Sequence, residues 1–67
     1  MTTVLVNGEP TELATSLTVR QLLERLELQG RRVAIEHNGD ILPRSRYDDT
    51  RLAEGDRFEI IIAVGGG

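Results

Sequence analysis

The sequence contains no cysteine and no lysine, and each absence excludes a kind of chemistry. Without cysteine the chain has no disulfide bond, no thiolate nucleophile and no cysteine-based metal site. Met1 is the only sulfur-containing residue, and its thioether cannot carry transferable sulfide. Without lysine, one copy of the chain cannot accept the carboxyl group of another copy through a lysine isopeptide bond.

The chain also has little positive charge. Its 8 basic residues, all arginines, are outnumbered by 11 acidic residues, the net charge is -3, and no basic stripe with interleaved aromatic residues is present. We therefore expect no nucleic-acid partner, and expect a protein partner with a basic face. No apolar run approaches a transmembrane span and no signal-peptide pattern is present, so we expect a cytoplasmic protein without a membrane partner.

With 67 residues the chain has room for one small domain around one core. Apolar and β-branched residues predict strands at about 2–7 and 9–13, joined at Asn7-Gly8. This dipeptide is the typical signal of a two-residue hairpin turn. Pro10 cannot donate a hydrogen bond to a neighbouring strand, so the second strand is expected at a sheet edge.

A helix is predicted to begin at Thr18, where Gln21 completes a capping box. Its apolar residues recur at the spacing of one helical face: Val19, Leu22, Leu23 and Leu26. The helix is predicted to end near Leu28-Gln29, with Gly30 as a left-handed cap. The apolar stripe needs a surface on which to pack, and a sheet is the only candidate.

Three further strands are predicted at about 32–37, 40–42 and 57–64, with a polar and irregular stretch at 44–52. The resulting order, β-β-α-β-β-β, favours a mixed four- to five-stranded sheet with the last strand central and the helix across one face. This is the α+β arrangement called β-grasp, or ubiquitin-like. The last strand is the most apolar run in the chain, which suits a central position.

The last predicted strand leads directly into Gly65-Gly66-Gly67. We therefore expect a folded domain at 1–64 and a flexible glycine tail at 65–67. An extended tail could project on the order of 13 Å from Val64, at about 3.3 Å per residue, into a channel too narrow for side chains. The α-carboxylate of Gly67 would then be the functional group. A frayed terminus without a role is the alternative.

A second candidate surface lies beside this tail. Ile61 and Ala63 of the last strand, together with Leu5 of the first, are expected on the sheet face opposite the helix. A solvent-facing sheet surface should be polar, so apolar residues there predict a docking site for a partner. Isolated apolar residues on a surface are the ordinary alternative.

Catalytic groups are sparse. His37 is the only histidine, and without a second ligand at metal spacing we expect it to be structural or solvated. The acidic residues around Asp48-Asp49 lack the spacing of a calcium loop. No nucleophile–base pair is present, so the chain is expected to be a carrier and substrate rather than an enzyme.

Several segments together resemble the ThiS family, the sulfur carriers of thiamine biosynthesis. They are residues 33–45, which include Pro43-Arg44, residues 52–56, which include Glu54-Gly55-Asp56, and residues 59–67 with the glycine ending. The di-glycine ending is shared by the wider ubiquitin-like superfamily. The Pro-Arg region followed by Glu-Gly-Asp in so short a chain is what points to this branch.

The resemblance implies that an E1-like adenylating enzyme of the ThiF type uses MgATP to activate the Gly67 carboxylate. A persulfide donor then supplies sulfur, and a thiazole synthase of the ThiG type takes it from the resulting thiocarboxylate. The chain itself would bind no cofactor or metal and would be a monomer when free. Three alternatives stay open: the small subunit of molybdopterin synthase, a ubiquitin-like protein modifier, and an interaction domain with an idle tail.

Overall fold

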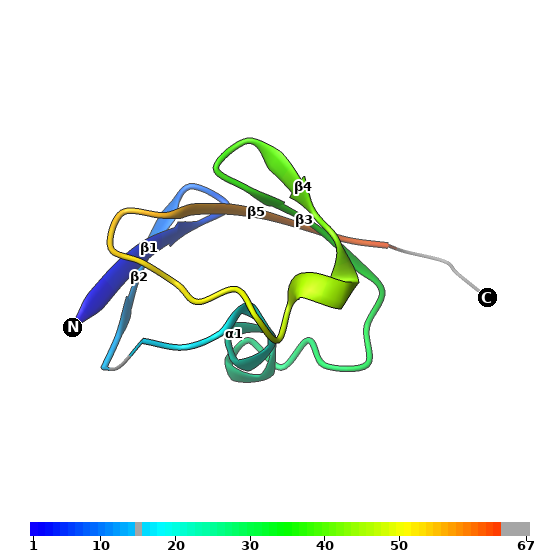
Figure 1. The fold of residues 1–67 in the computed structure, drawn as a ribbon, viewed down its shortest axis with the longest axis horizontal. Coiled ribbons are helices and arrows are strands. Elements are labelled where there is room, and N and C mark those ends of the chain that lie inside the picture. The colour runs from blue at the N-terminus through cyan, green and yellow to red at the C-terminus, as the bar shows by residue number, and fades with distance from the viewer. Residues whose placement is uncertain (15, 64–67) are drawn as a thin grey trace.

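A computed structural model describes residues 1–14 and 16–63 of the chain (Figure 1). Its elements are β1 (Thr2–Val6), β2 (Glu9–Leu13), α1 (Val19–Arg25), β3 (Val33–His37), β4 (Asp40–Leu42), the 3-10 helix η1 (Arg44–Arg46) and β5 (Arg57–Ile62). The predicted element order is confirmed. Strands β1, β3 and β5 are shorter than predicted, and Val64 and the predicted tail at 65–67 lie outside the described residues.

The five strands form one mixed sheet in the order β2-β1-β5-β3-β4. Strand β5 is central, parallel to β1 and antiparallel to β3. Strand β2, which contains Pro10, lies at an edge as predicted. Figure 1 shows α1 lying across one face of the sheet, and the downstream end of β5 at the opposite end of the molecule from the N-terminus.

Two asparagine side chains hold β5 from opposite sides. Asn7 accepts a hydrogen bond from the Ile60 amide at 2.7 Å and donates one to the Ile60 carbonyl at 3.2 Å. Asn38 accepts from the Arg57 amide at 2.8 Å. Both asparagines have φ of 52°, a left-handed conformation that asparagine tolerates and that the predicted Asn-Gly turns require. The turns therefore connect strands and also continue the hydrogen bonding of the central strand beyond the ends of its neighbours.

The start of α1 follows the prediction, but its end does not. The Thr18 side chain accepts from the Gln21 amide while the Gln21 side chain accepts from the Thr18 amide, which confirms the capping box. The last helical residue is Arg25, and the left-handed residue that ends the helix is Glu27, with φ of 61°. Gly30 is also left-handed, with φ of 81°, but it lies beyond the end of the helix. The predicted end near Leu28-Gln29 was therefore wrong.

Hydrogen bonds at this end explain why the helix stops early. The amide of Glu27 donates to the Glu24 carbonyl at 3.0 Å, and the amide of Leu28 donates to the Leu23 carbonyl at 2.8 Å. These two bonds form a Schellman motif, which usually brings an apolar residue back against the last turn. Leu28 accordingly packs against the core, and its burial offsets the strain of a non-glycine residue at positive φ.

The segment at 44–52 contributes more to the fold than its polar sequence predicts. Carbonyl groups of Thr50 and Tyr47 accept from the first amides of α1, those of Val19 and Arg20, at 2.9 and 3.1 Å. These amides have no partner within the helix itself. Tyr47 and Leu52 are both only 3% exposed, so this irregular segment also closes one side of the core.

The core lies between α1, the sheet and this segment. Its buried residues are Val4, Leu13, Val19, Leu22, Leu23, Ile35, Tyr47, Leu52, Phe58 and Ile60. Leu26, the last residue of the predicted helix stripe, is only partly buried. No helix in the described ranges is long and apolar enough to cross a membrane.

Candidate functional site

The end of β5 is the platform from which the predicted tail would start. Strand β5 is bonded to β1 on one side and to β3 on the other. The Ala63 amide donates to the Arg32 carbonyl at 2.9 Å, which continues the pairing one residue beyond Ile62. The chain is thus held by the sheet up to Ala63. The predicted functional residues Gly65, Gly66 and Gly67 lie outside the described residues.

Two of the three predicted docking residues lie together at this platform. Ile61 is 61% exposed and is paired with Ala34 of β3. Ile61, Ala63 and Ala34 line one shallow hollow, whose other lining residues are Arg32, Val33 and Arg44. Apolar and positively charged groups therefore meet at the end of β5.

Leu5, the third predicted docking residue, lies elsewhere on the same sheet. It pairs with Arg57, four residues before Ile61, which separates the two positions by about 13 Å along the strand. Leu5 is half-buried and lines a different hollow, with Gly8 and Glu59 among its neighbours. Docking through these residues stays a prediction. Ile61 and Ala63 would form one contact surface, and Leu5 would belong to a separate one.

The same sheet face carries two features that the sequence analysis missed. Ile41 of β4 is 71% exposed and lies opposite Glu36. Glu36 is also directly opposite Glu59 of β5, so two like charges share a cross-strand position, which is unfavourable unless a cation lies nearby. The two-residue turn at Asn38-Gly39 sets this register, so the position of Ile41 could have been inferred from the sequence.

His37 lies at the other end of the sheet from Ala63. Its ring stacks on Phe58 with centroids 4.6 Å apart and planes 4° apart, and its Nε2 lies 3.1 Å from Oδ2 of Asp56. Both contacts are internal, which is the structural role expected from the sequence. Among the described residues, no three histidine, aspartate or glutamate side chains come close enough together to hold a metal ion.

Asp56 links this histidine to two turns. Burial acts to raise the pKa of Asp56, but hydrogen bonds from the Ala53 amide, at 2.9 Å, and the Asn38 side chain, at 3.2 Å, together with His37, outweigh it. The pKa of Asp56 is therefore held below its ordinary value of 3.8. The charged carboxylate thus stabilises the junction between the turn at 53–56 and the turn after β3.

This pKa shift predicts a loss of stability in acid. A carboxylate whose folded pKa is below its unfolded value contributes stability that is fully present above pH 3.8 and is lost as pH falls through the folded pKa. Replacement Asp56→Asn should lower the free energy of unfolding near pH 7 and flatten its decline below pH 3.8, measured by urea denaturation across pH. The exposed Asp49→Asn is the matched control. An unchanged pH profile for Asp56→Asn would contradict the assignment.

A mixed five-stranded sheet with its last strand central and one helix across one face defines the chain as a β-grasp protein. The ThiS family matches residues 4–67. A crystal structure of the thiamine biosynthesis protein ThiS from Geobacter metallireducens is similar to this fold, with a TM-score of 0.81 and 37% identity, over 97% of this chain and 99% of that one. The chain belongs to the ThiS family, which confirms the predicted resemblance and the predicted fold.

Curated relatives agree with this assignment. The sulfur carrier protein ThiS of Bacillus subtilis is 36% identical over 75% of this chain and 76% of that protein. A thiazole synthase of Paramagnetospirillum magneticum is 39% identical over 96% of this chain, and the chain spans only 20% of its length. The sequence-based prediction of a thiamine-pathway sulfur carrier is thereby confirmed at the level of the family.

Proposed function

We propose that the chain carries sulfur as a thiocarboxylate at Gly67 and delivers it for thiazole formation. The observation that carries this proposal is the match to the ThiS family, which extends through residue 67. The fold supports it, because β5 is the central strand and leads toward the glycine segment from the most constrained part of the sheet. The chain is a carrier and substrate in this scheme, and the catalytic groups belong to its partners.

The chemistry needs an activating enzyme, because a carboxylate ionised at neutral pH is a poor electrophile. In the first step an E1-like adenylating enzyme of the ThiF type uses MgATP, an oxygen of the Gly67 carboxylate attacks the α-phosphorus, and pyrophosphate leaves. The terminal sulfur of a persulfide donor then attacks the acyl carbon, and AMP leaves. A second thiol cleaves the resulting acyl disulfide, which forms a new disulfide and releases the thiocarboxylate.

The proposed acceptor of the sulfur is a thiazole synthase of the ThiG type. Supporting this choice, a region similar to this chain forms part of longer proteins that are themselves named thiazole synthase, in Paramagnetospirillum magneticum and Magnetococcus marinus. A carrier sequence within the same polypeptide as the synthase would keep donor and acceptor close together. Membership of the ThiS family favours this route over the molybdopterin and protein-modifier alternatives.

The proposal is tested by intact mass spectrometry after incubation with the adenylating enzyme, MgATP and a persulfide donor. The expected product has one oxygen exchanged for sulfur, and fragmentation assigns the exchange to Gly67. Omission of ATP is the control and should leave the mass unchanged. Sulfur found on an internal residue, or ladders of self-conjugated chains, would contradict the proposal.

Docking of the activating enzyme is proposed at Ile61 and Ala63, and this gives a separate prediction. Ile61→Arg should fold, because the side chain is 61% exposed, but should weaken activation about tenfold to a hundredfold, which corresponds to about 1.4–2.8 kcal/mol. The measurement is the concentration of carrier at half-maximal ATP–pyrophosphate exchange. Ile41→Arg adds the same charge to edge strand β4 and should have a smaller effect. Equal losses from both variants would contradict docking centred on Ile61.

A further inference from the structure

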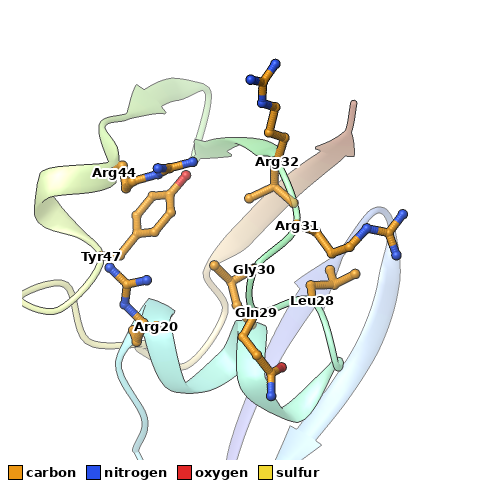
Figure 2. A pocket seen from close by; sticks show the side chains of 10 residues that line it. Arg20, Leu28, Gln29, Gly30, Arg31, Arg32, Arg44 and Tyr47 are labelled. Carbon is orange, nitrogen blue, oxygen red and sulfur yellow. The ribbon is translucent and has the colours of Figure 1, made fainter. Parts of the chain in front are cut away.

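Half of the arginines in this acidic chain line one hollow. The hollow, of about 350 Å³, lies between α1, the segment that precedes β3, and the 3-10 helix (Figure 2). Its lining comprises four arginines (Arg20, Arg31, Arg32 and Arg44), the apolar residues Leu23, Leu28 and Val33, and Gln29, Gly30 and Tyr47. No acidic residue is among them. We call Arg31, Arg32 and Arg44 the arginine rim.

Charge pairing distinguishes the three rim arginines from Arg20. Arg20 forms an ion pair with Asp48 at 3.0 Å and lies over the ring of Tyr47, 5.7 Å from its centroid. The three rim arginines form no ion pair with any carboxylate of residues 1–14 and 16–63. Adjacent cations repel one another, so an anion bound from outside would stabilise this arrangement.

The rim continues to the platform at the end of β5. Arg32 and Arg44 line this hollow and also the shallow hollow that contains Ile61 and Ala63. The Arg32 carbonyl is itself the acceptor for the Ala63 amide. Positive charge and the proposed docking residues thus form one continuous surface where the described chain leads toward the glycine segment.

We propose that the arginine rim binds an acidic peptide segment of the enzyme that activates the carrier, an inference that rests on the proposed function. Arginine is suited to this role because its planar guanidinium can pair with a carboxylate through two hydrogen bonds. The local positive charge offsets the net charge of -3, which would otherwise repel an acidic partner. The net charge had predicted the opposite, a partner with a basic face.

The directions of the side chains favour an extended segment over a single small anion. Figure 2 shows Arg44 extending toward the hydroxyl of Tyr47, across the hollow from Arg31 and Arg32, which extend outward from its edge. Small anions are bound by donors that converge on one point, whereas these guanidinium groups lie on different sides of the hollow and do not converge. An acidic strand or loop can contact them one after another while its apolar atoms cover Leu28 and Val33.

The test compares two double variants with the same change in net charge. Arg32→Glu/Arg44→Glu alters the rim, and Arg25→Glu/Arg51→Glu alters exposed arginines that do not line the hollow. At low ionic strength the rim variant should lower kcat/KM for carrier activation, measured by ATP–pyrophosphate exchange, by at least about tenfold, within the range of electrostatic steering. The control variant should change kcat/KM less than about twofold. Added salt should reduce the difference in kcat/KM between the rim variant and the wild type. If both variants lose kcat/KM equally while the wild type is active in ATP–pyrophosphate exchange, the docking proposal alone is overturned. If the wild type itself shows no exchange, the proposed function is overturned.

A second measurement does not depend on the enzyme. An oligoglutamate peptide titrated into the ¹⁵N-labelled carrier should shift the amide resonances of Gly30, Arg31, Arg32 and Arg44, and these shifts should be absent in the rim variant. Inorganic phosphate, added to give the same concentration of negative charge, should shift these resonances far less. Equal or larger shifts with phosphate would identify a small-anion site and overturn the peptide proposal, as would peptide shifts located at Arg25 and Arg51.

Discussion

Removal of Gly66 and Gly67 is expected to abolish activation of the carrier while leaving the free energy of unfolding within a few tenths of a kcal/mol. Glycine offers no side chain to pack, so removal of two glycines from the end of the chain should cost little. The truncated chain still ends in an α-carboxylate, that of Gly65, but this group lies two residues, about 7 Å of extended chain, short of the position at which the enzyme would activate Gly67, and the other carboxylates are side chains. The measurements are ATP–pyrophosphate exchange and urea denaturation of the same preparation.

A length-matched control separates the carboxylate from the glycines that carry it. Semisynthesis of the chain with an amide at Gly67 retains every residue and removes only the ionised oxygen. This protein should also be inactive in exchange and should still compete with the wild type for the enzyme. Exchange by the truncated protein, or by the amide, would mean that the activated group is somewhere else.

Leu22→Ala is expected to destabilise the domain by about 2–5 kcal/mol. Leu22 is fully buried on the sheet-facing side of α1, and a domain of this size has few other layers that could close the cavity. Small domains have a total stability of about 5–15 kcal/mol, so one substitution could remove much of it. The expected result is a large drop in the urea midpoint, with the slope of the transition unchanged.

Two neighbouring helix positions serve as controls for this prediction. Leu26→Ala should cost less, because Leu26 is only partly buried at the C-terminal cap. Glu24→Ala, on the exposed face, should stay within about 0.5 kcal/mol of the wild type. A midpoint for Leu22→Ala close to that of Glu24→Ala would mean that the buried face of α1 is wrongly assigned.

The parts of the fold that were predictable depend on short-range patterns. Asn7-Gly8, Asn38-Gly39 and the Thr18 capping box each specify a local conformation that few other residues stabilise, and all three are present in the structure. The apolar run of the last strand correctly indicated a central position. Recognition of the ThiS family likewise depended on contiguous residues rather than on spatial contacts.

The end of α1 and the role of the 44–52 segment were not predictable in this way. Glycine is the usual left-handed residue at a helix end, but here the docking of Leu28 on the core stabilises that conformation at Glu27. Tyr47 and Leu52 lie in a polar stretch without helix or strand periodicity, so nothing local marks them as buried. Their position follows from hydrogen bonds between this stretch and the residues around the start of α1.

The sequence by itself determined the element order, the central last strand and the glycine segment that follows it, because each is encoded in neighbouring residues. Only the tertiary structure decided which side chains share a surface. The strand register separated Leu5 from Ile61, and the paths of two loops brought Arg31 and Arg32 to the same hollow as Arg44. Such groupings depend on register and loop path, which are set by packing of the whole core, and so a net charge of -3 did not reveal a positively charged surface beside the end of β5.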